Sequence, residues 1–247
     1  MKRLNKVGDP RRRLLIKALA AGLFSAGLPG ANALAAGVFG SKPARLSAGQ
    51  SVYRISGQAT VNGREATLQT RINPGDTVQT EQNSEIIFVV NGNHSMILRG
   101  GSHLVIEPRK VASGSLLIDG LRLLTGRLLS VSRNATMRVN TSTATIGIRG
   151  TGFYVESAPE LTYFCTCYGI TDIAANADPQ SRTTVESKHH DRAVYIAKDA
   201  GQGKNIRNAP FLNHSDQELA LIEALVGRTT PFVPDSDTYG TPQRDYR

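Results

Sequence analysis

Residues 137–156 read MRVNTSTATIGIRGTGFYVE, and this stretch sets the class of fold that we expect. In its first half, Thr and Val alternate with other residues, and a period of two places the two sets on opposite faces of a strand. β-Branched side chains also suit a pleated sheet. In its second half, Gly150 and Gly152 let the backbone turn sharply or approach another strand closely. We therefore expect two extended runs with a turn at residues 149–153 between them.

Short runs of the same kind continue on both sides of this stretch. They are separated by turn residues such as Asn62-Gly63, which accept the positive φ of tight hairpins. Many short strands with turns about every eight to twelve residues predict an all-β domain. The expected strands span residues 51–56, 58–61, 65–72, 77–80, 84–90, 95–99, 103–107, 121–124, 127–131, 161–168, 170–174, 182–188 and 192–197.

A faint internal repeat favours one architecture within the all-β class. Residues 78–107 and residues 139–156 each hold a short alternating run, then an Arg-Gly pair, then a further extended run. Repetition favours a β-roll or β-solenoid, in which neighbouring rungs cover one another, and a β-sandwich is the alternative. Residues 46–198 show no helical period.

One short helix is expected near the C-terminus, at residues 216–226. Ser215 and Glu218 have the spacing of a capping box, apolar residues follow at helical spacing, and Gly227 can supply the left-handed stop. A helix of about 11 residues is marginal in water by itself. We therefore expect it to dock on the sheet or on a partner.

The first 35 residues are typical of an export signal. Seven basic residues precede a mildly apolar run at residues 18–28, and small residues at 31–35 fit the A-x-A cleavage rule. We expect cleavage after Ala35. The adjacent Arg11 and Arg12 resemble a twin-arginine signal, while an ordinary secretory signal and a retained membrane anchor are the alternatives.

Removal of this signal changes the charge of the chain. The 247 residues carry a formal net charge of +9, but residues 1–35 hold seven basic residues and one acidic residue, so a mature chain keeps +3. The charge therefore gives no support to a nucleic-acid partner. We expect a periplasmic protein without membrane anchoring, with a linker at 36–45, a β domain at 46–198 and a C-terminal extension at 199–247.

The opening stretch also carries a family resemblance. It holds the pattern V-x-T-x-x-A-x-x-G-I-R-G-T-x-F-x-V, in which Arg149, Gly150, Thr151, Gly152 and Phe153 form the central part. Residues 75–80, 98–102 and 124–126 carry further segments in the same order. This set resembles the FecR-type periplasmic domain, over residues 48–198.

The resemblance implies a non-catalytic receiver in bacterial envelope signalling. FecR-type proteins contact an envelope partner and relay its state, so a protein partner in the cell envelope is expected. For residues 149–153, we expect a packing motif without a ligand, and a partner-binding motif is the alternative.

One cluster of residues suggests chemistry. Both cysteines of the chain, Cys165 and Cys167, lie in one tripeptide, and positions i and i+2 of a strand point to the same side. His189 and His190 follow at a distance that suits a neighbouring strand or turn. Thiolate and imidazole are ligands for zinc or copper, so these four residues are the candidate metal ligands.

Two other interpretations of the cysteines stay open. An oxidising compartment permits a Cys165–Cys167 disulfide, although extended i and i+2 positions strain that bridge. The thiols can also be buried as small apolar groups. The sequence holds no phosphate loop, nucleophile elbow or H-E-x-x-H helix. Two hypotheses remain: an exported, non-catalytic FecR-type binding domain, and a periplasmic metal-binding or redox protein.

Overall fold

The computed structural model describes residues 43–112, 114–178, 180–201 and 203–233. The predicted export signal, residues 1–35, lies outside the described residues. So do most of the predicted linker, 36–45, and the end of the predicted C-terminal extension, 199–247.

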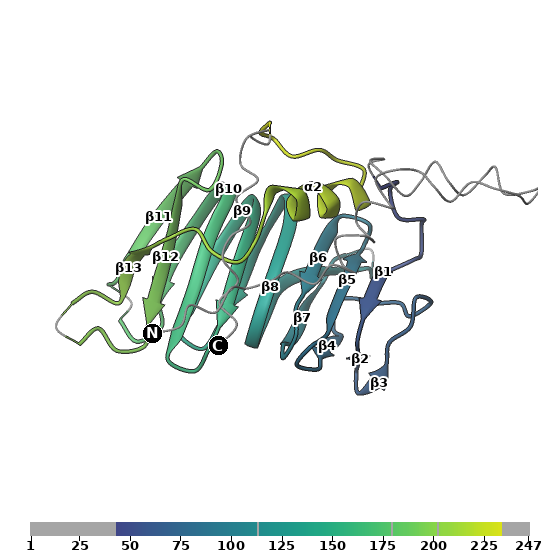
Figure 1. Cartoon of the computed structure of the whole chain (residues 1–247), viewed down its shortest axis with the longest axis horizontal. Coiled ribbons are helices and arrows are strands. Elements are labelled where there is room, and N and C mark those ends of the chain that lie inside the picture. The colour runs from purple at the N-terminus through teal and green to yellow at the C-terminus, as the bar shows by residue number, and fades with distance from the viewer. Residues whose placement is uncertain (1–42, 113, 179, 202, 234–247) are drawn as a thin grey trace, which may run out of the picture. The chain divides into compact units, whose positions relative to one another are not determined.

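The described residues form one sheet of 13 strands and one helix (Figure 1). All strand pairs in this part of the chain are antiparallel. The elements are β1 (Val52–Ser56), β2 (Ala59–Val61), β3 (Arg64–Glu65), β4 (Thr77–Thr80), β5 (Glu85–Val90), β6 (His94–Leu98), β7 (His103–Lys110), β8 (Leu116–Asn140), β9 (Ala144–Ser157), β10 (Leu161–Ala175), β11 (Arg182–Ser187), β12 (Arg192–Ala197), β13 (Ile206–Ala209) and α2 (Asp216–Leu225).

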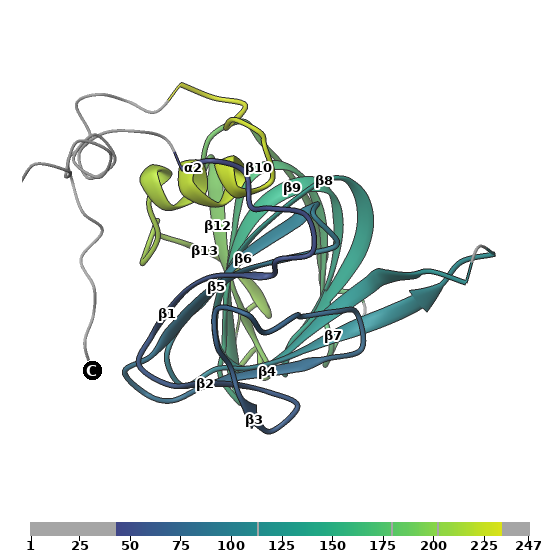
Figure 2. The ribbon, with the colours of Figure 1, turned by 90° about the vertical axis from the view of Figure 1, so that its right-hand side faces the viewer.

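Strand β8 joins the parts of the sheet because it is 25 residues long. Its first part pairs with β7, its middle pairs with β6, and its second part pairs with β9. The sheet curls at this strand, and the β7–β8 hairpin extends away from the other strands (Figure 2).

The alternation of side chains along the strands builds two apolar clusters. In β9, Phe153 and Val155 belong to a large cluster inside the curl, whereas Tyr154 belongs to a second cluster on the opposite face. In β10, Phe164 and Cys165 divide in the same way. The central strands are therefore buried on both faces.

Helix α2 covers the second apolar cluster and lies across the sheet near β6 and β8 (Figures 1 and 2). It begins with the expected capping box, in which the Ser215 hydroxyl accepts from the Glu218 amide at 3.3 Å and the Glu218 carboxylate accepts from the Ser215 amide at 2.9 Å. Leu219, Ile222 and Leu225 are buried against the sheet. The predicted all-β class with one short C-terminal helix is confirmed.

The predicted turn at residues 149–153 is wrong, because these residues lie inside β9. The hairpin turn lies at residues 141–143 instead. There, the Thr141 amide donates to the Ala144 carbonyl at 2.9 Å, and the Ala144 amide donates to the Thr141 hydroxyl at 3.0 Å.

Residues 149–153 mark an irregularity shared by three neighbouring strands. Gly150 has a φ of +61°, and Gly169 of β10 has a φ of +91°. The pairing register shifts beside both glycines, and β8 shifts at the same level. A Cβ on Gly152 would lie 2.4 Å from the Tyr168 ring, so close approach is the reason for that glycine.

Other strands also differ in extent from the sequence-based prediction. The strand expected at 65–72 is limited to Arg64–Glu65, and the two runs expected at 121–131 belong to the single strand β8. Strand β13 was not predicted. In the described part of the chain, no helix has the length and apolar character needed to cross a membrane.

Candidate functional site

Strand β10 places the two cysteines on the face that α2 covers. Cys165 and Cys167 are fully buried in the second apolar cluster, and both thiols are free. The alternation of the strand puts their sulfur atoms on one side. The site therefore begins with two sulfur ligands on a rigid central strand.

The turn between β11 and β12 supplies an imidazole. The His190 amide donates to the Cys167 carbonyl at 2.9 Å, and His190 has a φ of +52°, which holds the turn against β10. Its Nδ1 lies 3.5 Å from the Cys165 sulfur. Asp191 accepts from the Lys188 amide at 2.6 Å, and this hydrogen bond lowers the pKa of the Asp191 carboxyl.

The segment before α2 supplies a second imidazole, which the sequence analysis did not select. His214 is buried, and its Nε2 lies 3.4 Å from the Cys167 sulfur and 3.2 Å from His190 Nδ1. Its ring stacks on Tyr154 at a centroid distance of 4.5 Å. Asn213, with a φ of +63°, turns the chain just before this ring.

The hydrogen bonds of the two rings fix which nitrogen carries a proton. His214 Nδ1 lies 2.7 Å from the Leu212 carbonyl, which can only accept, so Nδ1 donates. His190 Nε2 lies 3.1 Å from an Asp216 carboxylate oxygen and donates in the same way. In the neutral rings, the other two nitrogens then hold lone pairs that face each other and the sulfurs.

The four inward atoms lie close enough to one another to bind one ion. The sulfurs of Cys165 and Cys167 and the inward nitrogens of His190 and His214 all lie within 4.8 Å of one another. Around zinc, with bonds of ~2.0–2.3 Å, the edges of a tetrahedron are ~3.3–3.8 Å. The nitrogen–sulfur distances of 3.4 and 3.5 Å and the nitrogen–nitrogen distance of 3.2 Å are close to these edges.

The two thiols differ in their tendency to ionise. A hydrogen bond from Cys167, with smaller contributions from His190 and His214, lowers the pKa of the Cys165 thiol, although burial opposes it. Burial raises the pKa of the Cys167 thiol, and the nearby Cys165 sulfur adds to this effect. Without a cation, the pair thus carries one negative charge more readily than two.

His189 lies in a second group with Asp216, outside the four-atom set. Its Nε2 lies 2.9 Å from an Asp216 carboxylate oxygen, and its ring is partly exposed. Asp216 is the first residue of α2 and contacts both His189 and His190. The structure therefore brings Cys165, Cys167 and His190 of the predicted ligands together, and it adds His214.

The residues of the opening motif either pack in the core or pair with a residue of the neighbouring strand. Phe153 is fully buried and stacks on Phe164 at 5.7 Å. Arg149 is half exposed and forms an ion pair of 2.9 Å with Asp172 on the neighbouring strand. Thr151 is buried beside these residues.

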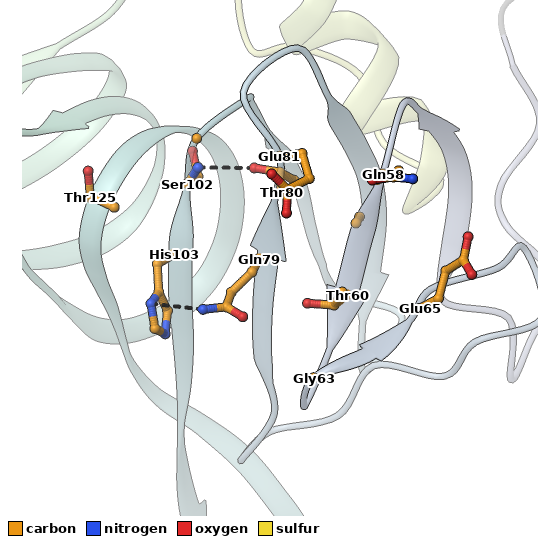
Figure 3. Close-up of a pocket in the computed structure, with 12 residues that line it drawn as sticks. Gln58, Thr60, Gly63, Glu65, Gln79, Thr80, Glu81, Ser102, His103 and Thr125 are labelled. Atoms are coloured by element: carbon orange, nitrogen blue, oxygen red, sulfur yellow. Dashed lines mark hydrogen bonds between the residues drawn. The ribbon is translucent and has the colours of Figure 1, made fainter.

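A polar pocket of about 690 Å³ lies elsewhere on the sheet, along β2, β4 and β7 (Figure 3). The Gln79 amide lies 3.1 Å from the His103 ring, and the Ser102 amide donates to the Thr80 hydroxyl at 3.1 Å (Figure 3). These groups bond to one another across neighbouring strands. They do not gather around one point as the Cys/His group does.

Comparisons with known proteins give a partial likeness. No family model matches the chain, and no curated protein matches it. Two solved structures of a candidate anti-sigma factor from Parabacteroides distasonis are similar to it. One is 14% identical with a TM-score of 0.41, over 54% of this chain and 58% of that chain. The other is 12% identical with a TM-score of 0.43, over 58% of this chain and 70% of that chain.

Proposed function

We propose that this chain is an exported, non-catalytic metal-binding protein, in which Cys165, Cys167, His190 and His214 bind one zinc ion. One observation carries this proposal. Each imidazole already donates its N–H outward, to the Leu212 carbonyl or to Asp216, so that both remaining nitrogen lone pairs converge with two sulfurs. Histidine ligands of metals are oriented in this way by hydrogen-bond acceptors behind the ring.

The charge and burial of the site favour zinc over copper. Two thiolates and two neutral imidazoles balance the charge of a divalent ion, whereas Cu(I) would leave a net negative charge beside two fully buried sulfurs. A tetrahedral set of two sulfurs and two nitrogens is also a common zinc environment. Four protein ligands leave no open position, which is typical of structural rather than catalytic zinc.

Metal analysis of the purified protein tests the site. We expect about one zinc per chain, with strong loss of zinc in the Cys167→Ser and His214→Gln variants. His103→Gln is the matched control, because this histidine lies in the polar pocket, and it should keep the zinc of the wild type. Cobalt in place of zinc should give the visible absorption of a tetrahedral thiolate site.

Two results would count against the assignment. Absence of bound zinc, copper or cobalt from a folded protein would overturn it. Two ions per chain would place a second ion on His189, His190 and Asp216, which also approach one another closely, and would give Asp216 the role of a ligand.

We propose as a second candidate function that the domain acts in the cell envelope through a protein partner. The support is the FecR-type pattern around Arg149–Phe153 together with the export-like character of residues 1–35. Mass spectrometry of the protein from the periplasmic fraction should show a start at or near Ala36. An intact Met1 would contradict cleavage, and Arg11→Lys with Arg12→Lys should block export by the twin-arginine route. Cross-linking in whole cells should then capture an envelope protein.

A further inference from the structure

The four candidate ligands come from two separate layers of the molecule. Cys165 and Cys167 lie on β10, and His190 lies in the turn that is hydrogen-bonded to β10. His214 lies outside the sheet, directly before Ser215, the N-cap of α2. An ion bound by all four would therefore join the sheet to the segment that leads into the helix.

The start of α2 and the site share contacts. Asp216, the first helical residue, accepts hydrogen bonds from the rings of His189 and His190. The first turn is also held by the ion pair between Arg99 and Glu218, at 2.7 Å. The segment before it is held by hydrogen bonds of Pro210 and Leu212 with the Tyr163 hydroxyl and of Asn213 with the Glu156 carboxylate. A helix of 10 residues is too short to persist without docking.

The C-terminal end of α2 is attached to the rest of the domain by contacts that do not involve the site. The Leu46 amide donates to the Leu225 carbonyl at 2.9 Å. The buried Glu223 carboxylate contacts Arg228 at 2.7 Å and also accepts from the Tyr168 hydroxyl. None of these contacts involves a candidate ligand, so they do not depend on an ion.

Without an ion, the site holds the segment before the helix only weakly. The inward ring nitrogens then accept at most S–H hydrogen bonds, from Cys165 to His190 at 3.5 Å and from Cys167 to His214 at 3.4 Å, and a thiol is a weak donor. His190 is held by its backbone hydrogen bond to Cys167. His214 has no strand to hold it, and it is the ring that can leave.

We propose that the metal ion fastens residues 210–219 to the sheet, so that metal occupancy controls whether the first half of α2 stays docked. This inference rests on the proposed zinc site. Release of the segment would uncover the apolar face around Tyr154 and Tyr163, which the segment and the helix now cover. The presence of zinc would thereby determine whether the domain exposes this apolar face.

Hydrogen exchange of the purified protein, with zinc and after treatment with a chelator, tests the proposal. Removal of zinc should speed exchange of the amides of residues 212–219 by about tenfold or more, because local opening then needs less free energy. Amides of the paired strands β8 and β9 should change little. The amides of residues 225–228 should change less than those of the first turn.

Three variants separate the ion from the other contacts. Cys167→Ser removes a ligand on the sheet and leaves the residues of α2 unchanged. In this variant, the amides of residues 212–219 should exchange quickly, and added zinc should not slow their exchange. Glu218→Gln breaks the ion pair with Arg99 but should keep the response to zinc. His103→Gln should behave as the wild type.

The outcomes distinguish this inference from the proposed function. If zinc binds at about one ion per chain while exchange of residues 212–219 is the same with and without it, the fastening is wrong and the metal site stands. If no metal binds, both fail. Should a variant not fold, the comparison of wild type with and without zinc still decides the question.

Discussion

Asp216 orients two histidine rings, one of which belongs to a proposed zinc ligand. Its carboxylate accepts from His189 and His190 and carries the only contact of an acid with the ligand His190 among the described residues. A carboxylate behind a ligating imidazole fixes the ring and raises its basicity. Because Asp216 is also the first residue of α2, it favours the helix through the macrodipole as well.

Asp216→Asn should therefore weaken zinc binding by about 10- to 100-fold, since the amide keeps the size of the side chain but lacks its charge. Competition with a chelator of known affinity measures this change. Asp172→Asn is the matched control on β10, because Asp172 pairs with Arg149 at a half-exposed position further along the strand from the cysteines. Equal affinity in the wild type and Asp216→Asn would remove the positioning role of Asp216.

At the scale of elements, the bend shared by β8, β9 and β10 depends on glycine. Gly169 has a φ of +91°, and a Cβ there would lie 2.6 Å from a methyl carbon of Thr151 and 2.9 Å from the Gly150 carbonyl oxygen. The neighbouring backbone belongs to a paired strand and cannot move aside easily. An alanine at this position would suffer both from its backbone conformation and from this contact.

Gly169→Ala should lower the free energy of unfolding by about 2–4 kcal/mol, since a left-handed non-glycine residue costs about 1–2 kcal/mol and the overpacking adds a similar amount. Gly63→Ala isolates the first cost, because Gly63 has a φ of +77° and a Cβ added there would meet nothing within 4 Å. Denaturation by urea measures both. Equal losses in the two variants would show that the crowding at Gly169 has no cost.

Local pattern predicts much of this architecture because strand period and turn chemistry act over a few residues. The alternation in β10 predicts that Cys165 and Cys167 share a face, and Ser215 with Glu218 predicts the start of α2. The path of β9 through Gly150 was not predictable, since a glycine favours a bulge as much as a turn. That choice depends on the neighbouring strands.

The position of His214 depends on tertiary packing in the same way. It follows Cys167 by 47 residues and lies in an irregular stretch between β13 and α2, where no period places a side chain. The sequence offers only an indirect sign that His214 belongs to the site. This histidine directly precedes the N-cap of a helix that must dock to be stable. Only the return of this segment across the sheet brings its ring to the sulfurs.

At the scale of the whole molecule, the buried His94 couples folding to pH. His94 lies on β6, and its Nδ1 lies 2.9 Å from the Ser132 hydroxyl. Burial, with a smaller effect of the Arg228 charge, lowers the pKa of His94 from 6.5 to about 4. Between these values the unfolded chain binds a proton that the folded chain does not, so the free energy of unfolding rises with pH.

Acidification from pH 6.5 to pH 4 should thus cost the wild type up to about 1.4 kcal/mol per pH unit through this residue. In His94→Gln this part of the slope should disappear, because the group that titrates is gone. Ser132→Ala is the matched variant: it removes the hydrogen bond at all pH values but keeps the buried ring, so it should lower stability while retaining the slope. Urea denaturation across this pH range, at one fixed zinc concentration, compares the three proteins. A wild-type slope that persists unchanged in His94→Gln would assign the acid sensitivity to groups other than His94.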